Sequence, residues 1–145
     1  MGGAEPHVRE LANSLAAEGH NVHLVSRHGI QQSTLDSRVF YTPLFMNDLW
    51  YFFIALWLRS YIRKHNIELV HGHQRMAISL ASWAARATDI PCIATIHGQL
   101  QYDIRSVVIR KFLDQVICVR EETAQQLSQC QHLHDKSNLI LNGVS

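Results

Sequence analysis

Two histidines stand at the ends of predicted strands, where a sheet can hold a ligand. His73 closes the segment Val-His-Gly-His and His97 closes Ala-Thr-Ile-His. In open parallel sheets, ligands bind outside the carboxyl ends of the strands. A neutral imidazole both donates and accepts hydrogen bonds, which suits a sugar or a phosphate. We expect His73 and His97 to face a ligand. His71 shares a face with His73 by alternation, and we expect it to be a packed, hydrogen-bonded core histidine.

The histidine pattern does not predict a metal site. Zinc sites in proteins use three or four ligands at supporting spacings, and no carboxylate or third ligand accompanies His71, His73 and His97. Cys130, His132 and His134 alternate, but no fourth ligand is near them and they fall in a polar segment that is typical of a solvated loop. We therefore expect neither a metal nor another cofactor.

Glycines at the start of the chain and directly after His97 add further residues to the candidate site. Gly2 and Gly3 precede an amphipathic helix, and glycine lets a ligand approach the backbone while a helix N-terminus attracts anions. Gly98 follows His97, and Asp103 lies in the same predicted loop. We expect Gly2, Gly3, Gly98 and Asp103 to take part in substrate or phosphate binding.

An apolar run, Leu49–Leu58, is followed by basic residues. The run is too short to span a bilayer, which takes about 20 apolar residues. A helix that is apolar nearly all round is either buried in a core or partly inserted elsewhere. Aromatic and basic residues side by side also suit a membrane surface. The candidate membrane contacts are Trp50, Phe53, Trp57, Arg59, Arg63 and Lys64.

The elements that must position these residues alternate along the chain. Apolar residues recur at helical spacing in residues 5–18, 47–65, 76–88 and 121–130. Short, almost fully apolar runs predict strands at 21–27, 68–71, 92–96, 115–119 and 138–141, with an extended piece at 38–42. This alternation indicates β-α-β units. We expect an α/β fold with a doubly wound, mainly parallel sheet, lacking the strand that normally precedes a glycine-rich turn.

Length and composition bound the function. The chain has 145 residues, which is enough for one domain with its own core, and 47% of them are apolar. The net charge of +1 argues against a nucleic-acid partner, which would require a concentrated basic face. Three cysteines without a Cys-x-x-Cys pair, and no signal peptide at the N-terminus, favour reduced thiols in the cytoplasm.

Five segments together resemble a known family. The start of the chain resembles the opening of the N-terminal domain of glycosyltransferase family 4. The matching residues are Gly2-Gly3-Ala4-Glu5, the helix end Leu-Ala-Ala-Glu-Gly-His and the following Asn-Val-His-Leu-Val-Ser. Glu68-Leu-Val-His-Gly-His and Ile93-Ala-Thr-Ile-His-Gly resemble two of its strands, the second with its terminal histidine. Val116-Ile-Cys-Val-Arg-Glu-Glu-Thr resembles a segment that usually has serine where Arg120 stands, and Asn142-Gly143-Val144 resembles the exit from the domain.

The resemblance implies one half of a GT-B enzyme, which has two Rossmann-like domains. Residues 1–145 would be the acceptor-binding domain, and the donor domain, which binds a nucleotide-sugar and supplies paired glutamates, would be absent. Transfer in this family retains anomeric configuration and needs no metal. By resemblance, Gly2 and Gly3 would line the cleft near the donor phosphates, with the helix tip stabilising the leaving diphosphate. His97 would contact the transferred sugar or the acceptor hydroxyls.

The function expected from the resemblance is therefore sugar transfer from a nucleotide-sugar to a glycan or lipid-linked acceptor, inactive without the donor domain. Its expected location is the cytoplasm, including the inner face of the membrane. Two alternatives stay open: a non-catalytic binding or interaction remnant, and half of a GT-B sugar-nucleotide epimerase. Acceptor binding without turnover would favour the remnant, and epimerisation of a nucleotide-sugar would favour the epimerase.

Overall fold

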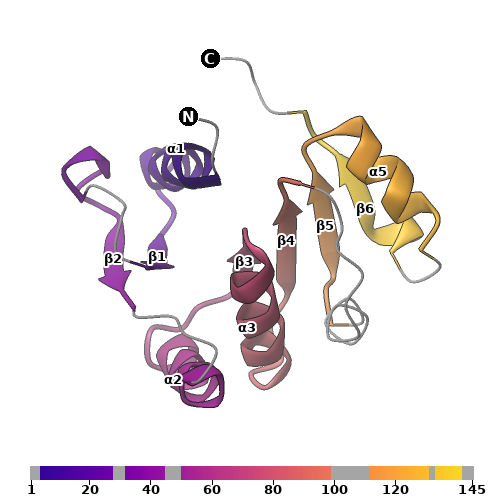
Figure 1. Cartoon of the computed structure of the whole chain (residues 1–145). Coiled ribbons are helices and arrows are strands. Elements are labelled where there is room, and N and C mark those ends of the chain that lie inside the picture. The colour runs from indigo at the N-terminus through magenta and orange to yellow at the C-terminus, as the bar shows by residue number, and fades with distance from the viewer. Residues whose placement is uncertain (1–3, 28–31, 45–49, 99–111, 131–132, 142–145) are drawn as a thin grey trace. The chain divides into compact units, whose positions relative to one another are not determined.

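A computed structural model describes residues 4–27, 32–44, 50–98, 112–130 and 133–141 of the chain (Figure 1). The chain forms two compact units, Met1–Tyr51 and Phe52–Ser145. The described strands lie in two sheets, one of two strands and one of four, and every pair of neighbours is parallel. The prediction of an α/β fold with parallel strands is thus confirmed.

The first unit contains helix α1 (Ala4–Ala17) and the parallel strands β1 (His23–Ser26) and β2 (Phe40–Pro43). A short 3-10 helix, η1 (Gln32–Thr34), lies between the strands in sequence. The amphipathic spacing of α1 places Ala12 and Ala16 in a small core. The same core contains Leu24 of β1 and Val39, so one apolar face of the helix accounts for the packing of this unit.

Among the described helices, three end on a residue with a left-handed backbone. Gly19 (φ 91°) follows α1, Asn66 (φ 50°) follows α2 (Tyr51–Lys64), and Asp89 (φ 59°) follows α3 (Arg75–Arg86). In each case the next amide donates to the carbonyl five residues back: His20 to Leu15, Ile67 to Ile62 and Ile90 to Ala85. This is the Schellman pattern, which satisfies carbonyls at a helix end.

The second unit is built on a four-stranded sheet. Its strands are β3 (Val70–Gly72), β4 (Cys92–Ile96), β5 (Gln115–Cys118) and β6 (Ser137–Leu139), and they are neighbours in that order. A second 3-10 helix, η3 (His134–Lys136), leads into β6. Helix α3 packs on β3 and β4, and α5 (Glu121–Ser128) packs on β5 and β6 (Figure 1). Because β-α-β crossovers are right-handed, both helices cover the same face of the sheet.

Alternation sorts the strand residues between the two faces of this sheet. The face under α3 and α5 carries small and apolar side chains that join the main core: Val70, Cys92, Ala94, Val116 and Cys118. Ala81 and Ala85 of α3 pack against them. Residues at the odd-numbered positions of β3 and β4 therefore point to the opposite face. His71, His73, Thr95 and His97 are all odd-numbered.

The buried cysteines serve packing. Cys92 and Cys118 are fully buried free thiols in the core of the second unit. Burial, and then the nearby charge of Asp114, raises the pKa of the Cys92 thiol to about 12, and burial also raises the pKa of Cys118. Neither thiol becomes a thiolate near neutral pH, so neither is a nucleophile.

Candidate functional site

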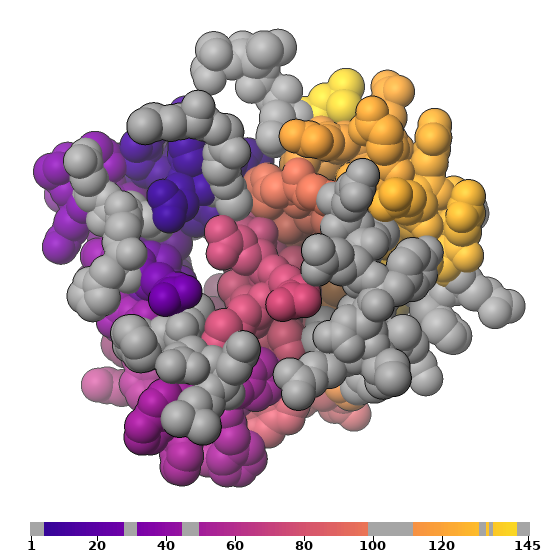
Figure 2. All heavy atoms as spheres, in the orientation of Figure 1, coloured from indigo at the N-terminus to yellow at the C-terminus, as the bar shows by residue number. Residues whose placement is uncertain are grey.

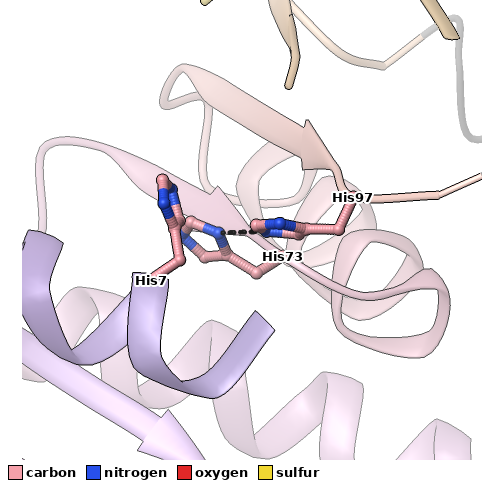
Figure 3. Close-up of side chains that lie close together, drawn as sticks. All are labelled: His7, His73 and His97. Atoms are coloured by element: carbon pink, nitrogen blue, oxygen red, sulfur yellow. Dashed lines mark hydrogen bonds between the residues drawn. The ribbon is translucent and has the colours of Figure 1, made fainter. Parts of the chain in front are cut away.

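A pair of imidazoles defines the candidate site at the carboxyl ends of β3 and β4. Nδ1 of His73 lies 3.4 Å from Nε2 of His97, and the ring centroids are 5.7 Å apart (Figure 3). Both side chains are half-buried. The two residues are 24 positions apart in sequence but each stands one residue beyond its strand. His7, also drawn in Figure 3, belongs to α1 in the first unit.

Strand register explains why these two histidines meet. His71 is the register partner of Ile93, and Gly72 of Ala94, so His73 falls level with Thr95. His97 is two residues beyond Thr95 and points to the same face. The sequence predicted that His73 and His97 stand at strand ends, and the structure brings them together.

The pair is supported from the side of β3. Nε2 of His71 is 2.8 Å from the hydroxyl oxygen of Thr95, and the His71 ring lies against that of His73 with centroids 4.1 Å apart. Thr95 is almost completely buried, so its hydroxyl is a fixed partner. His71 is thus a hydrogen-bonded histidine, as expected from the sequence, and its ring restricts the orientation of His73.

Gly72 fixes the backbone between the two β3 histidines. A Cβ atom at this position would lie 2.7 Å from the Cα of Ile78 in α3, closer than real Cβ contacts. Only glycine lets the end of β3 approach α3 this closely. The tight packing of Gly72 on Ile78 therefore fixes the position of the backbone from which the side chains of His71 and His73 extend on the opposite face of the sheet.

Gly98 and α5 hold the other side of the site. The hydroxyl of Thr123, a buried residue in the first turn of α5, donates to the carbonyl of Gly98 at 3.3 Å. Gly98 is exposed, and a Cβ atom there would meet no heavy atom of the described residues within 4 Å. The carbonyl after His97 is therefore anchored to α5, while the Cα of Gly98 faces open space among the described residues.

The remaining predicted ligand-binding residues lie outside the described residues. These are Gly2, Gly3 and Asp103. The histidine pair, Gly98 and the supporting Thr95 and Thr123 make up the described part of the site. Neither threonine was predicted from the sequence. Thr95 could have been identified from the sequence, because it stands two residues before His97 and so lies on the same face of the sheet. Thr123 could not have been identified, because its contact with Gly98 depends on how α5 packs.

Helix α2 presents an exposed apolar surface next to basic residues. Phe52 and Phe53 are 62% and 61% exposed and Trp50 is 51% exposed, while Ile54, Ala55 and Ile62 are buried. Atoms of this helix lie on the molecular surface in the space-filling view (Figure 2). Arg63 and Lys64 are exposed, whereas Trp57 and Arg59 are half-buried. The helix is therefore neither fully buried nor fully exposed.

The Nε atom of Arg59 is buried. It has no hydrogen-bond partner among the described residues. Arg59 and Arg63 are four residues apart and so share one side of α2, and no acidic residue occurs in this helix. Among the described residues, no helix has both the length and the apolarity needed to cross a bilayer.

Parallel strands joined through helices that pack on the sheet define a Rossmann-like α/β domain. The whole chain, residues 1–145, matches the model of Glycosyltransferase Family 4, and it belongs to that family. The resemblance found in the five sequence segments is thereby confirmed.

Two curated relatives belong to N-acetylglucosaminyltransferases. The chain is 28% identical over 131 residues to a phosphatidylinositol N-acetylglucosaminyltransferase subunit of Homo sapiens, with 81% of this chain and 27% of the relative covered. It is also 28% identical over 138 residues to the gpi3 subunit of the same-named enzyme of Schizosaccharomyces pombe, with 81% and 30% covered. The chain thus spans less than a third of the length of these relatives.

Solved structures share the fold. A glycosyltransferase from Rickettsia africae matches 99% of this chain and 40% of its own, with a TM-score of 0.82 and 22% identity. MurG of Acinetobacter baumannii matches 99% of this chain and 43% of its own, with a TM-score of 0.67 and 13% identity. A sucrose-phosphate synthase fragment from Thermosynechococcus elongatus gives a TM-score of 0.67 at 14% identity, covering 99% of this chain and 87% of its own. At these identities the likeness concerns the fold.

Proposed function

We propose that this chain is the acceptor-side domain of a retaining glycosyltransferase that transfers a sugar from a nucleotide-sugar to a lipid-linked acceptor. The observation that carries the proposal is the His73–His97 pair at the carboxyl ends of adjacent strands, in a chain that belongs to Glycosyltransferase Family 4. Activity requires a donor domain, which binds the nucleotide-sugar and completes the reaction centre.

In this proposal the imidazoles position hydroxyl groups. A neutral imidazole has one N–H donor and one acceptor nitrogen, so His97 can hold a sugar or acceptor hydroxyl in one orientation. His73, whose orientation is restricted by His71, sets the tautomer and direction of the His97 ring through their contact. The open backbone at Gly98 leaves room for the ligand. Gly2, Gly3 and Asp103 remain proposed contacts to phosphate or substrate.

The lipid character of the acceptor rests on α2 and on the names of two relatives. Phe52, Phe53 and Trp50 offer apolar side chains to a bilayer surface, and Arg63 and Lys64 offer positive charge to its phosphates. Both curated relatives are named for transfer to phosphatidylinositol, a lipid. We propose that the domain works at the cytoplasmic face of a membrane.

The test is sugar transfer by the full-length enzyme that contains this domain. Labelled nucleotide-sugars are supplied with phosphatidylinositol vesicles or with soluble glycans, and product is followed by chromatography. We expect transfer to lipid, and a loss of about 10²-fold or more in kcat/KM for His97→Ala. His20→Ala, which alters an exposed histidine of the first unit, is the matched control and should retain full activity.

Other outcomes separate the alternatives. Epimerisation of a nucleotide-sugar without any acceptor would replace the proposal with the epimerase. Acceptor binding with no turnover of any donor would replace it with a binding remnant. Equal activity of His97→Ala and His20→Ala would remove His97 from the site.

A further inference from the structure

Thr123 is a buried residue of α5 that holds the end of a different element. It lies in the first turn of the helix, is 2% exposed, and donates from its hydroxyl to the carbonyl of Gly98 at 3.3 Å. Threonine hydroxyls commonly bond to a carbonyl three or four residues back. Thr88, at the end of α3, does so with Ala84 at 2.8 Å and Ala85 at 3.1 Å. The hydroxyl of Thr123 instead connects α5 to the chain that leaves β4.

His97 stands between two fixed points of the backbone. The pairing of β4 with β5 ends with Ile96 and Cys118 as register partners, directly before His97. Gly98, directly after His97, is held by the hydroxyl of Thr123. Glycine has more conformational freedom than any other residue and costs the most entropy to order. An unrestrained Gly98 would therefore let the backbone at His97 move, and the contact with Thr123 restricts this freedom.

We infer that Thr123 is a positioning residue for sugar transfer, an inference that rests on the proposed function. Through the carbonyl of Gly98 it holds the backbone of His97 in the orientation in which the imidazole aligns a substrate hydroxyl. Because Thr123 is almost completely buried, a water molecule cannot take the place of its hydroxyl without entering the packed first turn of α5. The side chain acts through the backbone of another residue and does not itself contact the substrate.

A positioning role predicts which kinetic constant changes. In a variant without the Thr123 hydroxyl, His97 is still present and still binds a hydroxyl, but it is in the productive orientation for a smaller fraction of the time. A small misplacement of an aligning group can cost up to about 10²-fold in rate. The loss should therefore fall on kcat, with KM nearly unchanged. A purely structural role would instead lower the folded fraction and leave kcat per folded molecule unchanged.

The test compares Thr123→Val, which keeps the shape and removes the donor, with Thr123→Ser, which keeps the donor and removes a methyl group. Both are made in the full-length enzyme that contains this domain and assayed with phosphatidylinositol vesicles. We expect kcat per folded molecule to fall by about 10-fold in the valine variant, with KM nearly unchanged, and to recover in the serine variant. Thr88→Val removes a hydroxyl that is bonded at its own helix end, so it is the matched control and should keep the parental kcat. Circular dichroism gives the folded fraction of each variant.

A second measurement needs no sugar transfer. In protein isotopically labelled at histidine, the NMR signals of the His97 imidazole should shift in Thr123→Val and stay at their parental positions in Thr88→Val. In the parent protein, the hydroxyl proton of Thr123 should exchange with water slowly enough to be observed.

Three results would overturn the inference: parental kcat in folded Thr123→Val, an equal loss of kcat in Thr123→Ser, or a Thr123 hydroxyl proton that exchanges too fast to observe. If Thr123→Val is fully active while His97→Ala is inactive, only this inference fails and the proposed function stands. If no sugar is transferred at all, the proposed function fails, and the NMR measurements still decide whether Thr123 holds His97 in place.

Discussion

At the scale of single residues, the histidine pair depends on a glycine that a side chain cannot replace. Gly72 lies where a Cβ would come within 2.7 Å of the Ile78 backbone, and backbone cannot move away as a flexible side chain can. The strand and the helix would have to separate. This would shift both histidines that flank Gly72.

We predict that Gly72→Ala lowers the free energy of unfolding by about 1–3 kcal/mol, the usual cost of overpacking. Gly98→Ala is the matched control, since an added methyl there meets no atom of the described residues within 4 Å, and its free energy of unfolding should change by less than about 0.5 kcal/mol. Denaturant unfolding followed by circular dichroism measures both. Equal stability of the two variants would show that α3 does not press on β3 as described.

The same residues show what could be predicted from sequence. Apolar runs located the strands, and alternation correctly put His71 and His73 on one face. The contact between His73 and His97 could not be predicted, because register between strands is set by long-range packing. The hydrogen bond from Thr123 to Gly98 depends likewise on the placement of α5.

At the scale of elements, α1, α2 and α3 end in the same way, and the sequence indicates this only in part. Gly19 is a recognisable stop, but Asn66 and Asp89 adopt the same left-handed backbone without being glycine. Asparagine and aspartate tolerate this conformation at some energetic cost. Between α3 and β4, Asp89 is where the chain turns.

We predict that Asp89→Gly stabilises the protein by about 0.5–1 kcal/mol, because glycine removes the left-handed strain and keeps the Schellman bonds. Part of the gain is offset by the greater freedom of glycine in the unfolded chain. Gly19→Ala, the reverse change at an equivalent helix end, should destabilise the protein. Thermal unfolding of both variants checks the prediction, and a loss of stability in Asp89→Gly would contradict it.

At the scale of the whole molecule, the exposed apolar and basic side chains of α2 bear on the proposed binding to a membrane surface. Its exposed aromatic side chains, Phe52 and Phe53, lie in the first turn of the helix, and its exposed basic side chains, Arg63 and Lys64, lie in the last turn. Each positive charge close to an anionic bilayer contributes about 1 kcal/mol to the free energy of membrane binding. Insertion of apolar side chains adds a favourable free energy that salt does not screen.

We predict that the full-length protein binds vesicles containing phosphatidylglycerol, and that binding weakens as salt rises. Arg63→Glu together with Lys64→Glu should weaken it by about 30-fold or more at low salt. Phe53→Ser should weaken binding at both low and high salt. Phe40→Ser, at an exposed phenylalanine of β2, is the control. Co-sedimentation measures each, and binding insensitive to every α2 substitution would reject this surface.

The order of strands in the larger sheet has a consequence for how the chain folds. β3, β4, β5 and β6 are neighbours in the order in which they are synthesised. Their register partners, Val70 with Cys92, Ile93 with Gln115, and Val116 with Ser137, lie at nearly constant separations along the chain. Each loop closure therefore costs a similar entropy. Each strand after β3 can pair, as it leaves the ribosome, with the strand synthesised before it, so this sheet can grow one strand at a time during translation.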